Sequence, residues 1–178
     1  VYGGSKGLIV EDDPATTETD ESENSISADI EGNIVLDIFG GTIDTVFGGS
    51  NVNGNVFGKI TVNVLDLGGS CAAEIHNVYG GGRNAAYTPT TIGDYPEVNI
   101  INGTISKKTI GEGDDVTYWG GKVYGGGYGE TAIVTSNPKV TIGYSSDMTD
   151  PLPETLPQGY TSPDPDDYRS RSEERFSR

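Results

Sequence analysis

The sequence predicts an all-β protein, and more narrowly a right-handed parallel β-helix, or solenoid, of about four irregular coils. A phrase of valine, an aromatic residue and two glycines occurs four times, starting at Val1, Val46, Val78 and Val123. Only 33% of the residues are hydrophobic, and most of these are types that suit a pleated, half-buried surface. With 27 glycines and nine prolines, no ten-residue stretch keeps a helical period. An antiparallel β-sandwich is the alternative fold.

The aromatic phrase is the first strand of each predicted coil. Stacked coils place like residues above like, so four residues should form what we call the aromatic ladder: Tyr2, Phe47, Tyr79 and Tyr124. Alternation from Ile43 puts Phe47 on the side of Ile43 and favours the interior. The tyrosine hydroxyls need water or a partner and favour the outside. The sequence leaves the direction of the ladder open.

An alternating segment follows each phrase as a further strand and ends in a Gly-Gly or Asn-Gly turn signal. The distance from phrase to turn is nearly constant, at 23 residues in the second copy and 25 in the third. The return to the next phrase varies from 5 to 20 residues. Because the length varies only in this return segment, the pattern favours stacked coils. A short middle strand is expected in each coil, for example at 55–57 or 132–135. Asn102-Gly103 is also a hairpin signal, which supports the antiparallel alternative.

Glycine is expected where the chain turns with positive φ or where a neighbouring coil passes close above. In this interpretation Gly81→Ala lowers the free energy of unfolding by about 1–3 kcal/mol. The same change at Gly113, in a variable loop, is expected to have little effect.

The domain organisation follows from composition. Residues 1–146 form the repeat domain, with an acidic, solvated insertion at 11–31 that holds nine acidic residues and no Lys or Arg. Residues 147–178 form a Pro/Asp-rich linker and a charged C-terminal tail. We expect further domains in a larger parent chain.

The net charge of −16 argues against nucleic acid as a partner, because phosphate backbones bind clustered Lys and Arg. No apolar run reaches the roughly 18 residues of a membrane span. Cys71 is the only cysteine, which leaves neither an intrachain disulfide nor a Cys-x-x-Cys metal site. No cofactor or metal ligand is assigned, and calcium in an acidic loop such as 111–115 is the one candidate.

The longest return loop, 106–122, carries the candidate ligand site. It contains Trp119, the only tryptophan, beside Tyr118, and the acidic pair Asp114 and Asp115. Aromatic rings beside carboxylates can stack on sugars and bond their hydroxyl groups. Arg83, after a triglycine, is the fifth candidate residue. These residues predict a carbohydrate ligand; in the other interpretation Trp119 only covers the end of the stack.

An enzyme is the alternative function, because parallel β-helices also carry polysaccharide lyases and hydrolases. A lyase needs a calcium-binding carboxylate cluster and a Lys or Arg base. Arg83 or Lys122 would be the base, and the candidate carboxylates are Asp44, Asp66, Asp114 and Asp115. His76 has no nucleophile motif beside it in sequence. No catalytic residue is therefore assigned.

The Val-Tyr-Gly-Gly-Gly phrases, alternating with Val-x-Ile-x-Gly-Gly-Thr strands, resemble the glycine-rich repeats of large surface proteins of gut bacteria. Those repeats are similar to adhesin-type parallel β-solenoids. The resemblance covers about residues 33–146 and 1–10, with coils of uneven length and no anchoring motif. It implies a non-catalytic structural or adhesive module, extracellular or at the bacterial cell surface. The implied partner is a carbohydrate or a host or cell-surface protein.

Overall fold

The computed structural model describes residues 1–11, 25–66 and 70–143. Over these residues the chain forms twelve β-strands, one 3-10 turn and no α-helix. The all-β prediction is therefore confirmed. No described helix is long and apolar enough to cross a membrane. The predicted linker and tail, 147–178, lie outside the described residues.

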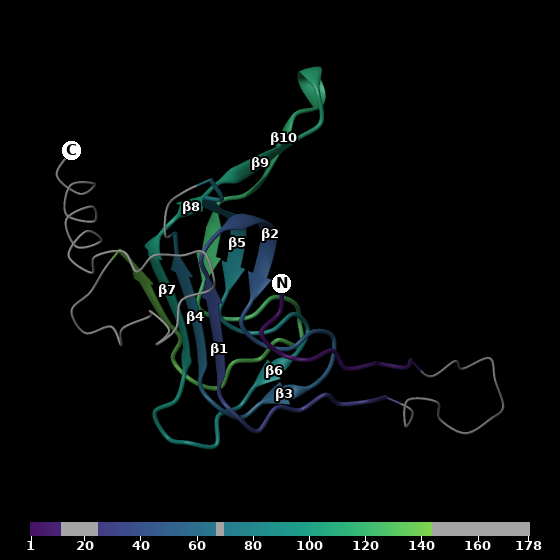
Figure 1. Cartoon of the computed structure of the whole chain (residues 1–178). Helices are drawn as coiled ribbons and strands as arrows, with labels where there is room; N and C mark the ends of the chain where they lie inside the picture. Colours follow the sequence, from purple (N-terminus) through teal and green to yellow (C-terminus); the bar gives the residue numbers. More distant parts are fainter. Residues whose placement is uncertain (12–24, 67–69, 144–178) are drawn as a thin grey trace.

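Three short parallel sheets make up the body (Figure 1). The largest contains, in spatial order, β1 (Ile34–Ile38), β4 (Ile60–Leu65), β7 (Pro96–Asn102) and β12 (Lys139–Ile142). The second contains β2 (Gly41–Phe47), β5 (Ala73–Tyr79) and β11 (Lys122–Tyr124), with β8 (Thr104–Ile105) also paired to β5. The third contains β3 (Asn55–Val56) and β6 (Ala86–Tyr87). Each sheet thus collects equivalent strands from different repeats.

Equivalent residues of the repeats lie side by side in neighbouring strands. In the second sheet Val46 pairs with Val78, and Val78 pairs with Val123. In the largest sheet Val62 pairs with Val98. The alignment of the repeats inferred from the sequence is therefore confirmed.

The predicted right-handed β-helix of about four coils is wrong, because the strands form several short parallel sheets and do not close into a solenoid. A closed coil needs a strand from every repeat on each side, whereas the third sheet has two strands of two residues each. The antiparallel sandwich is wrong as well, because all the pairings within the three sheets are parallel. In place of a hairpin at Asn102-Gly103, β8 leaves β7 and pairs with β5.

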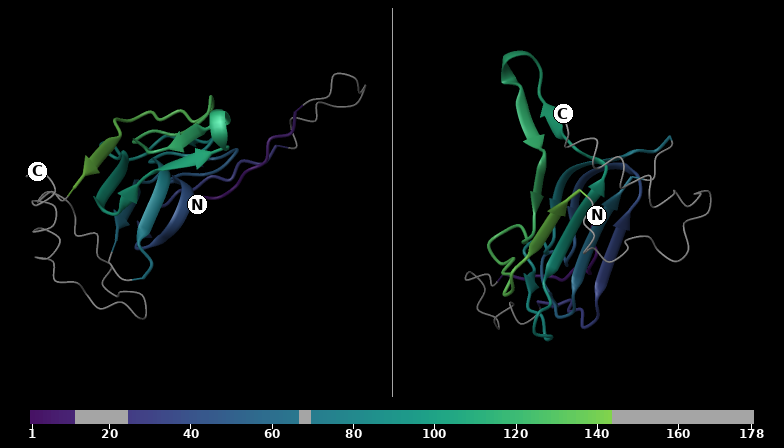
Figure 2. Two further views of the ribbon diagram at one scale, coloured as in Figure 1. Left: turned by 90° about the horizontal axis from the view of Figure 1, so that it is seen from above. Right: turned by 90° about the vertical axis from the view of Figure 1, so that its left-hand side faces the viewer.

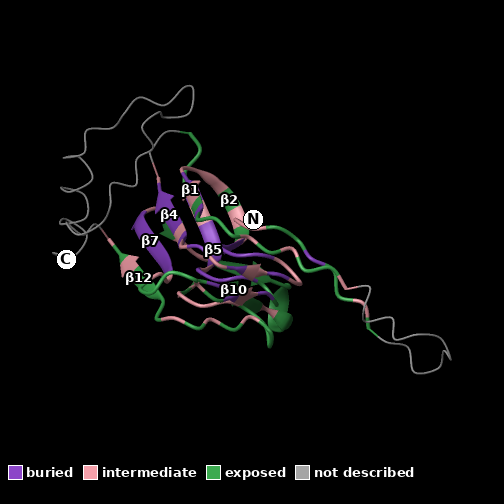
Figure 3. Ribbon diagram, turned by 90° about the horizontal axis from the view of Figure 1, so that it is seen from below, coloured by how far each residue is buried: buried purple, intermediate pink, exposed green. Residues whose placement is uncertain are grey.

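The core lies between the sheets, and Figure 3 shows β4, β5 and β7 as mainly buried strands. The core side chains of these strands belong to one apolar cluster: Ile60, Val62, Val64, Ala73, Ile75, Val78, Val98 and Ile100. Burying one Val or Ile side chain contributes about 1.5–3 kcal/mol. Tyr87 of β6 belongs to the same cluster and is the largest fully buried side chain.

Tyr87 makes folding stability sensitive to alkaline pH. Burial, with a smaller contribution from Asp94, raises the pKa of Tyr87 to about 12. The ordinary pKa of tyrosine is about 10. Between about pH 10 and 12 the unfolded chain can ionise this hydroxyl and the folded chain cannot. The stability that Tyr87 provides through its protonated form is therefore complete below about pH 10 and is lost as the pH rises through about 12. We expect the free energy of unfolding to fall more over this window in the wild type than in Tyr87→Phe. Urea unfolding of both proteins checks this, and equal losses would contradict it.

The aromatic phrases approach one another closely at their glycines. A Cβ on Gly81 would lie 2.8 Å from the Gly127 nitrogen, although Gly81 does not have a positive φ. The close approach expected at Gly81 is therefore confirmed. Gly113 has open space but a φ of +63°, which strains alanine, so the small effect expected there is corrected. Gly126, with nothing within 4 Å of an added Cβ, is the unstrained comparison.

The predicted acidic insertion, 11–31, lies only partly within the described residues. Residues 12–24 lie outside the described part of the chain. After them, Ile26 pairs with Leu8, and Ile30 packs against the core. Ile30 thus contacts the core from within the predicted insertion, whereas Ile26 is 61% exposed.

A hairpin leaves the body between β8 and β11. Its strands, β9 (Lys107–Ile110) and β10 (Thr117–Gly120), pair antiparallel around the 3-10 turn η2 (Gly113–Asp115). Figure 1 and Figure 2 show the hairpin extending beyond the sheets. The return loop 106–122 is thus an ordered arm, and its base lies against β5.

Candidate functional site

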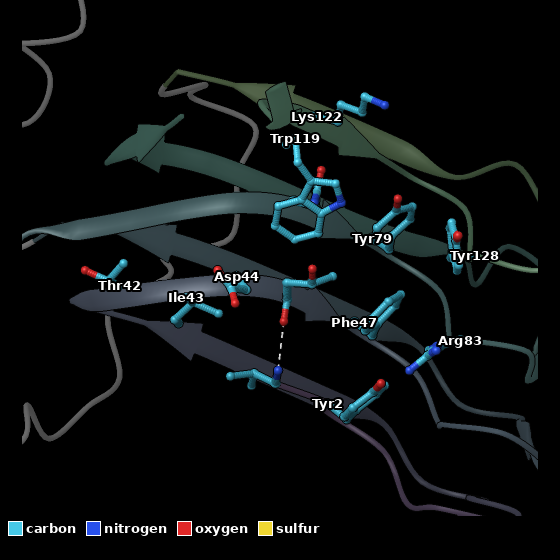
Figure 4. Close-up of a pocket in the computed structure, with 14 residues that line it drawn as sticks. Tyr2, Thr42, Ile43, Asp44, Phe47, Tyr79, Arg83, Trp119, Lys122 and Tyr128 are labelled. Atoms are coloured by element: carbon cyan, nitrogen blue, oxygen red, sulfur yellow. Dashed lines mark hydrogen bonds between the residues drawn. The ribbon is translucent and has the colours of Figure 1, made fainter. Parts of the chain in front are cut away.

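A groove of about 710 Å³ lies on the outer face of the second sheet, beside the base of the hairpin (Figure 4). Its walls combine rings of the aromatic ladder with polar side chains of β2 and β5 and with Trp119 of β10. Figure 4 shows Tyr2, Phe47 and Tyr79 in one row, with Arg83 and Tyr128 on one side of the row and Trp119 on the other.

The aromatic ladder faces outward. Val46 and Val78 are fully buried, so the residues that follow them, Phe47 and Tyr79, lie on the opposite face of the sheet. Ile43 also packs against the core although it precedes Val46 by three positions, so the alternation breaks once between them. Counting across this break pointed Phe47 inward, which is wrong.

Successive rings of the ladder are stacked. Their centroids are 5.0 Å apart at each step, with interplanar angles of 9°, 12° and 15°. Phe47, covered on both faces, is only 6% exposed, whereas Tyr124 at the end of the row is 44% exposed. The inner rings therefore present their edges to the groove, and Tyr79 adds its hydroxyl group. Burial, and then the neighbouring tyrosines, raise the pKa of Tyr79, so its hydroxyl stays protonated further into the alkaline range than that of an exposed tyrosine.

The base of the hairpin is fixed to the sheet. Lys108 Nζ lies 3.1 Å from Asp44 Oδ1, and the Gly121 amide donates to the His76 carbonyl at 2.7 Å. Trp119 meets the His76 ring at 69° with centroids 6.0 Å apart. Among the described rings, none is stacked on Trp119, which is 39% exposed at the groove.

His76 belongs to a cluster of side chains that could not be predicted from the sequence. Its Nδ1 lies 3.0 Å from Ser106 Oγ, and its Nε2 lies 3.8 Å from Asp44 Oδ1. The Ser106 hydroxyl donates its one proton to Glu74 Oε1 at 2.8 Å, so His76 Nδ1 is the donor to Ser106. A serine whose proton is bound to a carboxylate in this way is not activated by the histidine. The cluster therefore orients the hairpin base.

The predicted site residues separate into two groups. Trp119 and Arg83 both line the groove. Tyr118 does not line it and is 70% exposed, while Asp114 and Asp115 belong to η2, at the far end of the hairpin in Figure 1. Tyr118, Asp114 and Asp115 are therefore not part of the groove.

Sequence reasoning missed most of the groove. Tyr2, Phe47 and Tyr79 were predicted as a ladder but not as part of the ligand site. Asn77 and Tyr128 were not selected at all, although Tyr128 follows the fourth aromatic phrase at the position that Arg83 has after the third.

Comparison with known proteins gives no relative from which a function could be inferred, so we infer the function from the groove. Protein-family models, curated proteins and solved structures were compared with the chain, and none matches. Within the residues that the structure describes, no group of three or more His, Cys, Asp or Glu side chains could hold a metal ion. Calcium remains an untested prediction.

Proposed function

We propose that this chain is a non-catalytic saccharide-binding module of a secreted or cell-surface bacterial protein. The observation that carries the proposal is the groove itself, where a partly exposed tryptophan lies beside a row of aromatic ring edges and a polar floor. Its volume of about 710 Å³ lies within the usual range for small-molecule sites, about 300–1,000 Å³.

Trp119 supplies the apolar surface. A pyranose has C–H groups on its faces, and these pack on a flat aromatic ring. The ion pair Lys108–Asp44 and the contact with His76 hold the indole before a ligand arrives. A site that is already ordered loses less side-chain entropy on binding.

The floor supplies hydrogen bonds for sugar hydroxyls. Thr42, Thr45 and Asn77 line the groove with hydroxyl and amide groups, and Tyr79 and Tyr128 add phenols. Each of these groups both donates and accepts, as a sugar hydroxyl does. This set suits a ligand with many hydroxyls better than an apolar one.

The groove is poorly suited to cleaving a glycosidic bond. Glycoside hydrolysis needs two carboxyl groups across the bond, and among the described residues that line the groove only Asp44 has one. That carboxylate is paired with Lys108. In the lyase alternative Arg83 would be the base, but the hydrogen bond that Arg83 donates to Tyr2 raises the pKa of a guanidinium that is already fully protonated. These features favour binding over catalysis.

The resemblance of the repeats to bacterial surface proteins supports the setting of the proposal. A module that displays a saccharide groove on stacked strands suits adhesion to the glycans of another cell. A host or cell-surface protein partner would then be recognised through its sugars.

Replacing Trp119 with alanine tests the function. On an array of neutral and acidic oligosaccharides, the wild type is expected to bind a subset, and Trp119→Ala to lose about tenfold or more in affinity for it by calorimetry. Tyr118→Ala is the matched control, because Tyr118 is the adjacent exposed ring outside the groove. Equal affinities in the two variants, or no bound saccharide, would contradict the proposal.

A further inference from the structure

We propose that the groove selects acidic saccharides, whose carboxylate or sulfate groups are held by Arg83 and Lys122. This inference rests on the proposed function and names the class of its ligand. The supporting observation is that basic side chains without an ion pair lie at the groove, on a chain that is strongly acidic overall.

Basic residues of the described chain fall into two sets. Lys59 and Lys139 are within 4 Å of Glu97, and Lys108 is paired with Asp44. Four others form no ion pair with a described carboxylate: Lys6, Arg83, Lys107 and Lys122. With a net charge of −16, leaving four cations unpaired is a feature to be explained.

Two of the four unpaired cations line the groove, and the other two lie close to these along the backbone. Arg83 and Lys122 line it. Lys6 is bridged to Asn51, which is bridged to Arg83, so Lys6 belongs to the same column of residues beside the ladder. Lys107 packs against Gly121, which precedes Lys122 in the chain. A Cβ added to Gly121 would lie 2.9 Å from Lys107 Cγ.

The groove is therefore positive on a protein that is negative overall. The one lining carboxylate, Asp44, is offset by Lys108 at 3.1 Å, which leaves the charges of Arg83 and Lys122 uncompensated. A cleft lined by one sign of charge raises the local concentration of ligands of the opposite sign. The acidic remainder of the surface repels the same ligands and directs them to this face.

Arg83 has the geometry for a carboxylate or a sulfate. Its guanidinium is exposed, and its hydrogen bond with Tyr2 and its bridge to Tyr128 place it beside the ladder (Figure 4). A guanidinium offers parallel N–H donors that match two oxygens of one acidic group. Trp119 would then pack on the sugar ring while Arg83 binds its acidic substituent.

Calorimetry with charged and neutral forms of one oligosaccharide tests the inference. The probes are tetragalacturonic acid, its fully methyl-esterified and therefore neutral form, and a chondroitin sulfate tetrasaccharide. We expect an acidic probe to bind at least about tenfold more tightly than the ester, with an affinity that falls as NaCl is raised. Chondroitin sulfate carries both carboxylate and sulfate groups, so the same tetrasaccharide without its sulfates is also titrated. A loss of affinity identifies sulfate as the group recognised, and an unchanged affinity identifies carboxylate.

Arg83→Gln should lose about tenfold in affinity for the acidic probe and clearly less for the ester, so that the preference for the acid shrinks. Lys139→Gln removes the same charge outside the groove and should leave both unchanged. Equal binding of acid and ester, unaffected by Arg83→Gln, would overturn the inference and leave saccharide binding intact. No binding of any probe or array saccharide would overturn the proposed function with it.

Discussion

Gly48→Ala is expected to lower the free energy of unfolding by about 3 kcal/mol or more. A Cβ at this position would collide with the Gly80 carbonyl oxygen and would lie 2.6 Å from Ile60 Cγ2 and 2.9 Å from Val62 Cγ2. None of these atoms can retreat easily, because Ile60 and Val62 are fully buried and the Gly48 amide donates to the Tyr79 carbonyl at 2.8 Å.

Gly126→Ala is the matched control for this change. Gly126 belongs to the same aromatic phrase in the last repeat, and nothing lies within 4 Å of an added Cβ. Urea midpoints of the two variants give the comparison. Small and equal shifts would mean that the phrases are not fixed against one another, and the packing described for the ladder would be incorrect.

Tyr87→Ala is expected to cost about 3–5 kcal/mol, the usual cost of removing a large buried ring. Tyr87 is 0% exposed and fills the core beside the third sheet. That sheet has only two short strands, so few other contacts hold this side of the core. Thermal and urea unfolding of the variant measure the loss.

Tyr87→Phe separates the ring from its hydroxyl. Within the described chain the buried hydroxyl has no hydrogen-bond partner, and an unpaired buried hydroxyl costs about 1–3 kcal/mol. The phenylalanine variant should therefore be as stable as the wild type or more stable. A loss as large as that of Tyr87→Ala would instead assign the stabilisation to the hydroxyl.

Much of the fold could be predicted because it depends on local patterns. Repeated phrases predicted which strands lie side by side, and the turn signals at Gly41 and Gly103 coincide with positive φ values of 99° and 125°. Closure into coils could not be predicted correctly, because it depends on the third sheet. Strands as short as Asn55–Val56 and Ala86–Tyr87 leave almost no periodic signal.

The candidate site was predicted only in part. Trp119 and Arg83 could be selected by residue type, because each is the only tryptophan or arginine within residues 1–146. The direction of the ladder could not, because the alternation breaks between Ile43 and Val46. The position of Tyr118 outside the groove could not be predicted either, because it depends on which face of β10 meets the sheet.

Fluorescence of Trp119 shows whether a saccharide binds in the groove, because Trp119 is the only tryptophan of the chain and lines the groove. We propose titrating the protein with tetragalacturonic acid and, in parallel, with the array saccharide of highest affinity. We expect a saturable change in Trp119 emission whose midpoint equals the calorimetric dissociation constant. Saturable binding by calorimetry with unchanged emission would mean that the saccharide binds outside the groove.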